Sequence, residues 1–270
     1  MPSRGRRRLT LPEILVLSLA VVAVCMAALW LVSLALKNAG IVDIFWGLGF
    51  VLLAAVYSVA ADGFTGRKLL VLALVAVWGL RLSGYILWRN WGKGEDYRYA
   101  GWRERAGDRF WWTSLLQVFL LQGLLMWVIS MTVLAAQSAD EPDRLTWVDL
   151  AGTAVWGIGF FFEAVGDWQL ARFKADPANR GKVMRSGVWR YTRHPNYFGD
   201  ATQWWGLYLI AAGTADGYWT LFSPVLMTAL LLRVSGVALL ERAQVRTKPQ
   251  YREYIESTSA FVPWFPRRRA

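Results

Sequence analysis

Histidine and cysteine are almost absent from this chain of 270 residues, which contains one of each. The single histidine, His194, argues against a metal site built from imidazole ligands, so no metal is expected. The single cysteine, Cys25, has no second cysteine with which to form an internal disulfide. Charged residues make up only 18% of the chain, against about 25% in soluble domains. The composition therefore disfavours a soluble or disulfide-stabilised domain.

Long apolar runs dominate the rest of the sequence, and 56% of the residues are hydrophobic. A bilayer core requires about 20 apolar residues per helical crossing. Because lipid offers the backbone no hydrogen-bond partners, each crossing is expected to be a helix. The sequence predicts an all-α, polytopic transmembrane helical bundle that forms one membrane domain over residues 1–270. About seven spans are expected: Pro12–Leu36, Asp43–Ala61, Leu69–Trp88, Leu115–Ala135, Trp147–Ala171, Tyr197–Gly213 and Tyr218–Leu240.

The amino-terminal segment combines four arginines, between Arg4 and Arg8, with the apolar run Leu11–Leu36. This pattern is similar to that of a secretory signal peptide. However, the apolar core of such a peptide is only about 7–15 residues long. We therefore expect a retained first span rather than a cleaved leader.

The net charge of +11 is interpreted as a membrane property rather than as a sign of nucleic-acid binding. Lys and Arg gather in cytoplasmic loops and contact anionic lipids. With a cytoplasmic C-terminus, the segments Arg89–Arg109 and Arg172–Arg193 and the tail after Leu240 face the cytosol with 6, 7 and 7 Lys and Arg residues. The acidic segment Gln137–Arg144 then faces outward. The amino-terminal arginines are the exception, because they also lie outside.

Ionisable residues at membrane depth are costly, so they mark functional sites. Glu163 and Asp167 lie four residues apart, on one face of the expected fifth span. Two carboxylates on one face repel each other and require a cationic or hydroxyl-rich partner, such as the following cationic loop or a ribose. Asp43 is either the N-terminal cap of its helix or a buried acid. Arg233 and Glu241, near the end of the last span, either pair or extend to the membrane surface.

The expected third span carries Arg81 and Tyr85 among the small residues Gly79, Ser83 and Gly84. Small residues let a second helix or a ligand approach the backbone closely. This stretch therefore predicts either a helix contact in which Arg81 bonds to a carboxylate, or one wall of a ligand cavity.

The most informative motif runs from Ser186 to Asp200. Pro195 ends any preceding helix and favours extended backbone at His194. Asn196 lies where a new helix begins, and the free N–H groups of a helix start suit an anion. Arginines hold phosphate through paired hydrogen bonds, and aromatic rings offer flat faces to a heteroaromatic base. The motif predicts a nucleotide-sized pocket, or alternatively a belt at the lipid headgroups, built from Arg185, Arg190, Arg193, Trp189, Tyr191 and Tyr197.

The string Arg-His-Pro-Asn-Tyr-Phe-Gly-Asp at Arg193–Asp200 resembles the cofactor-binding segment of membrane sterol reductases, especially the C14 and C7 enzymes. The ending Phe261–Pro266 and the block Trp78–Arg89 are similar to the corresponding parts of the steroid 5α-reductases. The resemblance is close from Asp149 to Pro266 and looser before it. The chain as a whole looks like a bacterial subfamily of this group.

The resemblance implies an enzyme of the bacterial cytoplasmic membrane that binds NADPH and reduces a carbon–carbon double bond in a lipid-like substrate. Residues 1–146 would form the substrate side, and residues 147–270 would hold the cofactor. By position, Asp167 faces the adenosine, Lys174 is a cationic contact, and Asn196 and Asp200 lie near the nicotinamide. The implied cofactor contacts are Arg81, Glu163, Asp167, Lys174, Arg190, Arg193, His194, Asn196, Tyr197, Asp200 and Glu241.

The chain also departs from that family. Its early spans lack the Gln-x-x-Glu motif with which 5α-reductases hold an enone carbonyl, and Trp78 stands where they have a tyrosine. Reduction of a steroid Δ4 bond is therefore disfavoured, and another lipid alkene is expected. The cofactor would supply the hydride. The expected catalytic groups are Asp43, as an acid bonded to a carbonyl oxygen, and Tyr85, with Tyr208 as a further proton donor.

Two other functions stay open at this point. The same motif resembles isoprenylcysteine and phospholipid methyltransferases, in which Glu241 would lie near the charge of S-adenosylmethionine. The cationic segment Arg172–Arg193 and the pair Asn196 and Asp200 favour the reductase. A transporter or scaffold is the third interpretation, although transporters often show internal repeats and none is seen here.

Overall fold

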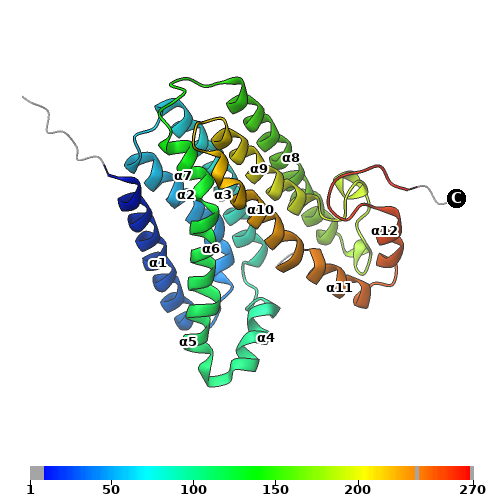
Figure 1. Ribbon diagram of the computed structural model, residues 1–270. Coiled ribbons are helices and arrows are strands. Elements are labelled where there is room, and N and C mark those ends of the chain that lie inside the picture. The colour runs from blue at the N-terminus through cyan, green and yellow to red at the C-terminus, as the bar shows by residue number, and fades with distance from the viewer. Residues whose placement is uncertain (1–8, 235–236, 268–270) are drawn as a thin grey trace, which may run out of the picture. The chain divides into compact units, whose positions relative to one another are not determined.

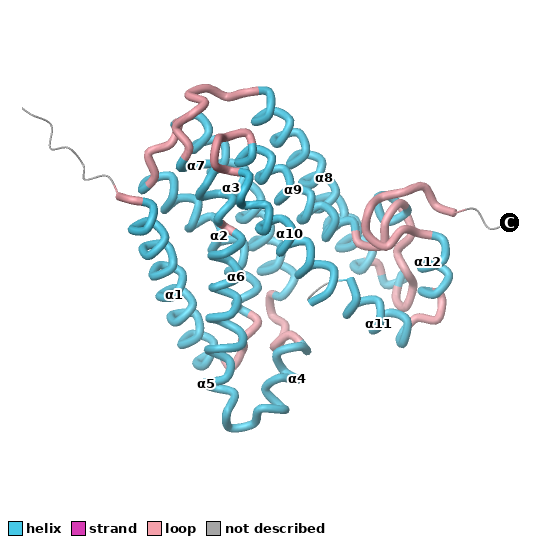
Figure 2. Tube along the Cα trace, in the orientation of Figure 1, coloured by secondary structure: helices cyan, strands magenta, loops and turns pink. Residues whose placement is uncertain are grey.

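The computed structural model describes residues 9–234 and 237–267. Within those ranges the chain is helical and has no strand (Figure 2), so the all-α prediction is confirmed. The helices, labelled in Figure 1, are α1 (Leu11–Leu36), α2 (Ile41–Ala60), α3 (Thr65–Asn90), α4 (Tyr97–Ala106), α5 (Phe110–Ser114), α6 (Leu121–Ile129), α7 (Met131–Ser138), α8 (Trp147–Ala175), α9 (Pro195–Ala212), α10 (Phe222–Ala229), α11 (Val237–Thr247) and α12 (Tyr251–Ser257).

Short turns of other helix types join or extend these elements. Two π-helical segments continue α5 into α6 and α10 toward α11. In a π-helix each backbone hydrogen bond joins residues five positions apart instead of four. The 3₁₀ and π segments are Gly107–Arg109, Leu115–Leu120, Pro177–Asn179, Gly187–Arg190, Tyr218–Leu221 and Leu230–Val234.

Five helical stretches of the described chain are long and apolar enough to cross a membrane. They are α1, α2, α3, the continuous stretch 97–138 and α8. The first five expected spans fall within them, and the protein has the make-up of an integral membrane protein. The sixth and seventh expected spans correspond to α9, with 18 residues, and to the shorter apolar helix Tyr218–Arg233. The arginines from Arg4 to Arg8 lie outside the described residues.

One segment differs from its expected form. Arg89–Arg109 was expected to be a loop, but helix α4 begins within it at Tyr97. The carboxylate of Asp96 accepts a hydrogen bond of 3.0 Å from the Arg98 amide, which satisfies a free donor at the helix start. The high charge of the segment hides the apolar pattern by which a helix is normally recognised.

The chain divides into two compact units. The first contains residues 1–146 and 211–220, and the second contains residues 147–210 and 221–270. In the first unit, α2 and α3 meet at Gly47 and Gly79, where a Cβ on either glycine would lie within 2.5 Å of the carbonyl oxygen of the other. The Ser83 hydroxyl accepts a bond of 3.1 Å from the Leu48 amide. The helix contact expected around Gly79 is therefore present, whereas Gly84 faces open space.

In the second unit, α8 and α9 pack through glycines that recur every seventh residue. Gly152, Gly159 and Gly166 lie on α8, and Gly199 and Gly206 lie on α9. A Cβ on Gly159 would lie 2.5 Å from the Gly199 oxygen, and one on Gly206 would lie 2.6 Å from the Gly152 oxygen. Such spacing lets two membrane helices approach to backbone contact along their length. The close approach brings together the polar residues of the two helices.

Candidate functional site

The motif Ser186–Asp200 folds as a short turn followed by a helix. Gly187–Arg190 forms one 3₁₀ turn, and α9 begins at Pro195, one residue before the start that the sequence predicts at Asn196. The turn is attached to α8: the indole Nε1 of Trp189 donates to the Gly166 oxygen at 3.0 Å, and the Val188 amide donates to the Gln169 carboxamide oxygen at 3.0 Å. The motif therefore starts α9 at a fixed position beside α8.

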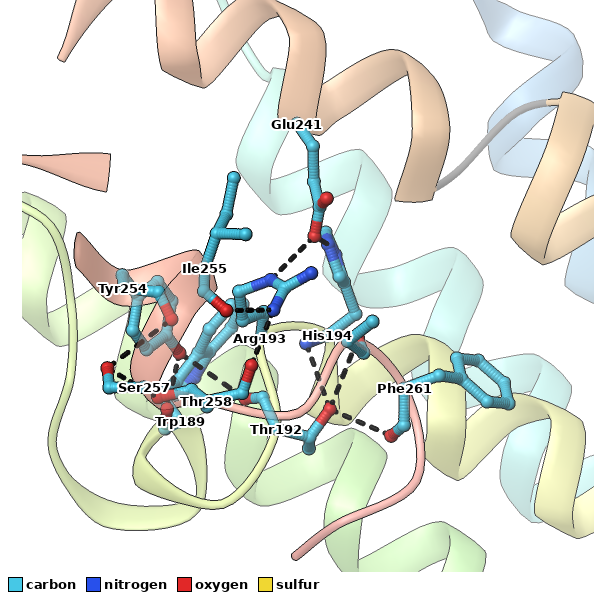
Figure 3. A network of polar contacts seen from close by, with 11 residues as sticks. Trp189, Thr192, Arg193, His194, Glu241, Tyr254, Ile255, Ser257, Thr258 and Phe261 are labelled. Carbon is cyan, nitrogen blue, oxygen red and sulfur yellow. Dashed lines mark hydrogen bonds and ion pairs between the residues drawn. The ribbon is translucent and has the colours of Figure 1, made fainter. Parts of the chain in front are cut away.

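Arg193 is the centre of a buried polar network (Figure 3). Its side chain is 7% exposed. Its Nε donates to Glu241 Oε1 at 2.7 Å, and its Nη1 donates to the carbonyl oxygens of Ile255, at 3.1 Å, and Thr258. The guanidinium thus joins the start of α9 to α11 and to the end of α12. We expected this arginine to contact phosphate, but its described bonds connect parts of the chain.

Glu241 receives a second contact within this network. His194 Nε2 lies 3.1 Å from the same Oε1 atom, and the imidazole stacks on the Tyr197 ring with 5.7 Å between centroids. Burial alone would raise the pKa of Glu241, but the hydrogen bonds from His194 and Arg193 outweigh burial and lower it. The carboxylate is therefore held in its charged form by its neighbours.

The C-terminal segment closes over the motif. The Tyr254 hydroxyl donates to the carbonyl oxygens of Trp189 and Thr192, and the Thr192 hydroxyl donates to the Phe261 oxygen at 2.8 Å (Figure 3). Burial raises the pKa of Tyr254, which keeps this donor protonated. The Trp264 amide continues the contact by donating to the Tyr191 oxygen at 2.9 Å. The two segments that resemble the reductase families, Arg193–Asp200 and Phe261–Pro266, therefore belong to one folded assembly.

A second polar cluster lies between α8 and α9. The carboxylates of Glu163 and Asp167 are nearly fully buried, with 3% and 5% of each residue exposed. Gln203 Nε2 donates to Glu163 at 2.6 Å, and Asn196 Nδ2 donates to Asp167 at 3.2 Å. Asp200 is buried too and follows Asn196 by one helical turn. The partners that the two carboxylates require include carboxamides from the neighbouring helix.

The other predicted cofactor contacts of this unit lie at its surface. Lys174, in the last turn of α8, and Arg190, at the end of the 3₁₀ turn, are exposed. In the described chain the Arg190 side chain makes no hydrogen bond or ion pair, so its guanidinium is available to a ligand. The assembly therefore has buried acceptors on α8 and α9, and exposed cations in the last turn of α8 and in the turn before α9.

The three candidates of the first unit belong to two places. The Asp43 carboxylate accepts hydrogen bonds of 2.6 Å from both Tyr99 and Arg98, which fix α2 to α4. On α3, Tyr85 packs against Trp88 with 6.0 Å between ring centroids. Arg81 is half-buried on the same helix. The catalytic roles of Asp43 and Tyr85 stay predictions, as does the cofactor role of Arg81.

Sequence reasoning missed two partners of the candidate residues. Gln203 could have been found, because Asn196, Asp200 and Gln203 recur along one face of a helix, as Glu163 and Asp167 do on α8. Tyr99 gave no such signal, because it lies in a segment that looked like a charged loop. Its hydroxyl also accepts a bond of 3.3 Å from Gln122, a contact that only the packing of the unit produces.

Comparisons with known proteins relate most of this chain to one protein family. The family model DUF1295, described as a protein of unknown function, matches residues 29–258. This family is steroid 5α-reductase-like. An uncharacterised protein of the fission yeast Schizosaccharomyces pombe is 26% identical in an alignment of 270 positions, which covers 87% of this chain and 75% of the yeast protein. No solved structure matches the chain.

Proposed function

The chain belongs to the DUF1295 family, and on that premise we propose that it is a membrane-embedded reductase. Its cofactor is NADPH, and its reaction is the reduction of a carbon–carbon double bond in a steroid-like or other lipid substrate. It functions in the bacterial cytoplasmic membrane with its C-terminus in the cytosol, surrounded by membrane lipids. The proposal places the cofactor in the second unit, on the polar residues of α8 and α9.

The observation that carries this proposal is the buried pair of carboxylates on α8. Burying Glu163 and Asp167 in an apolar helical protein costs free energy, and such residues are retained where they bind something polar. Carboxylate oxygens accept hydrogen bonds and cannot donate them when charged, so they suit the hydroxyl groups of a ribose. Their bonds to Gln203 and Asn196 fix both carboxylates in position before any ligand arrives.

The remaining parts of the cluster fit a nucleotide as well. Gln203 Oε1 is a buried acceptor that receives no hydrogen bond from the described residues, and it can take one from a ligand amide or hydroxyl. Lys174 and Arg190 provide exposed positive charge for phosphate groups. A dinucleotide requires both kinds of group, hydroxyl acceptors for its sugars and cations for its phosphates.

When bound, NADPH supplies the hydride for the reduction. The protein holds the ribose with Asp167 and Glu163 and orients the nicotinamide through Asn196 and Asp200. On the substrate, an acid must stabilise charge that develops during the reaction. We assign that task to Tyr85, because both oxygens of Asp43 already accept hydrogen bonds from Arg98 and Tyr99 and an ionised carboxylate cannot donate one.

A methyltransferase that uses S-adenosylmethionine is the second candidate function. In that case Glu241 would compensate the positive charge of the cofactor. In the structure Glu241 already forms an ion pair of 2.7 Å with Arg193. Because its charge is compensated within the chain, this contact supports the reductase over the methyltransferase.

Asp167→Asn tests the cofactor site. The substitution keeps a group that can bond to Asn196 but removes the charge, so we expect the affinity for NADPH to fall by about tenfold. The measurement is the rise in melting temperature of the purified protein, in detergent, over a range of NADPH concentrations. Asp176→Asn is the matched control, because Asp176 is an exposed helix cap and Asn is an equally good cap.

The proposal is wrong if NADPH does not change the melting temperature of the unmodified protein while S-adenosylmethionine raises it. If NADPH does bind, its consumption in the presence of lipid enones or of isolated alkenes identifies the substrate class.

A further inference from the structure

The second unit carries an open pocket outside the α8–α9 cluster. The pocket has a volume of about 420 Å³ and lies where the turn before α9 meets the end of α12. This volume is within the range of about 300–1,000 Å³ that small ligands occupy in proteins. Its walls include Arg185, Ser186, Arg190, Tyr254, Ser257 and Thr258.

Two arginines give this pocket its charge. Arg185 is held in place by the Gln250 carbonyl oxygen, by an ion pair of 3.3 Å with Glu253, and by the Tyr254 ring at 5.8 Å. The Glu253 side chain is 54% exposed, and an ion pair so open to water contributes little. Arg190 makes no ion pair in the described chain. The pocket therefore keeps a net positive charge, and hydroxyl groups line it beside the two guanidinium groups.

The backbone of the pocket is fixed before any ligand binds. Gly187 has a φ of +61°, a conformation that glycine adopts without strain. A Cβ at this position would also lie 2.3 Å from the Gln169 carboxamide oxygen, which itself accepts the Val188 amide. On the opposite wall, the Arg267 amide donates to the Ser257 oxygen at 2.9 Å. Two guanidinium groups on such a fixed backbone suit a phosphate, which each can hold through two hydrogen bonds.

Exposed apolar side chains precede one of the pocket residues in the sequence. Pro266 forms part of its wall, and Val262, Trp264 and Phe265 are 60%, 70% and 77% exposed. The backbone of this segment is held by the hydrogen bond from the Trp264 amide to the Tyr191 oxygen. The exposed side chains are therefore attached to a backbone of fixed position. Aromatic residues next to basic ones are typical of protein surfaces that lie in the headgroup region of a bilayer.

From these two features we infer that the pocket binds the phosphate of an anionic membrane lipid, while Trp264 and Phe265 insert among the lipids around it. Arg185 and Arg190 hold the headgroup phosphate, and the lipid tails extend toward the two aromatic rings. This contact fixes the C-terminal segment, and with it the end of α12, to the membrane surface. The inference shares Arg190 with the proposed cofactor site, but lipid binding is measured without NADPH, so its outcome does not depend on the reductase activity.

The test is lipid binding to the full chain in detergent, measured by native mass spectrometry with dioctanoyl phosphatidic acid and dioctanoyl phosphatidylcholine. We expect tighter binding of phosphatidic acid, reduced about tenfold by Arg190→Gln and reduced also by Trp264→Ala. Arg252→Gln is the matched control, because it removes the same charge from an exposed position on α12 and should change nothing.

Two results would overturn the inference. One is equal binding of phosphatidic acid to the unmodified protein and to the Arg190→Gln variant. The other is full competition by pyrophosphate together with no effect of Trp264→Ala, which would show a site for a soluble phosphate compound. Since Arg190 makes no bond within the described chain, its variant is expected to fold, and an unchanged melting temperature checks this.

Discussion

At the scale of single residues, the second unit depends on a few side chains that join segments far apart in the sequence. The single side chain of Arg193 contacts α11 through Glu241 and the end of α12 through two carbonyl oxygens. A buried charge that loses its partners is strongly destabilising. The Arg-His-Pro-Asn string therefore has a structural task in addition to any contact with a cofactor.

Arg193→Lys should destabilise the protein although it keeps the charge. A lysine ammonium cannot reproduce the planar set of donors that reaches three acceptors, and we expect a loss of about 2–4 kcal/mol. The measurement is thermal unfolding in detergent, together with the rate at which a protease removes the tail. Arg190→Lys is the control, since Arg190 is exposed. An equal effect of both substitutions would contradict the assigned role of Arg193.

Glu241 makes the same network sensitive to acid. Because its pKa is lower in the folded protein than in the unfolded chain, its contribution to stability is present above the unfolded value, about 4.3. That contribution is lost as the pH falls through the folded value. Glu241→Gln should therefore lower the melting temperature near neutral pH, and the difference from the unmodified protein should shrink as the pH falls below about 4. A difference that stays constant with pH would show that charge is unimportant there.

At the scale of helices, the glycines of α8 and α9 decide how closely the two elements pack. Their side-chain-free faces let the backbones touch, and this places Glu163 and Asp167 opposite Gln203 and Asn196. Capping determines the other unexpected element: Asp96 starts α4 inside a segment rich in charge. Local chemistry thus sets where the helices begin, and small residues set how near they approach.

Two substitutions on α8 separate packing from helix propensity. Gly159→Ala places a methyl group 2.5 Å from the Gly199 oxygen, and we expect it to cost about 1–3 kcal/mol. Gly157→Ala meets nothing within 4 Å and should stabilise the helix by up to about 1 kcal/mol. Thermal unfolding of the two variants in the same detergent measures both effects. Similar melting temperatures for the two variants would show that α9 does not pack closely on this face.

At the scale of the whole molecule, the distribution of charge is the basis of the proposed orientation in the membrane. The loop that joins α7 to α8 is acidic and receives bonds from Arg67 to the carbonyl oxygens of Pro142 and Arg144. The segments that follow α3 and α8 are rich in Lys and Arg. In the proposed orientation these basic segments lie in the cytosol, as the positive-inside rule favours.

Reporter fusions in a bacterial host test this orientation. Green fluorescent protein after Ala270 should fluoresce, because it folds in the cytosol, and alkaline phosphatase inserted after Glu141 should be active outside. The protein should also stay in the membrane fraction after alkaline carbonate extraction. Activity of alkaline phosphatase fused after Ala270 would contradict this orientation, because it would show that the C-terminus and the cationic segments lie outside.

The sequence alone determined the all-α class, the long apolar helices, the polar face of α8 and a helix start next to Pro195, because each depends on periodicity and capping within a few residues. Only the tertiary structure decided which partners those side chains have. Arg193 meets residues 48 to 65 positions away, and Asp43 meets Tyr99, 56 positions away. Such pairs depend on how whole helices pack, and no pattern local to either residue contains that information. The roles of the candidate residues in binding and catalysis stay predictions for the experiments described above.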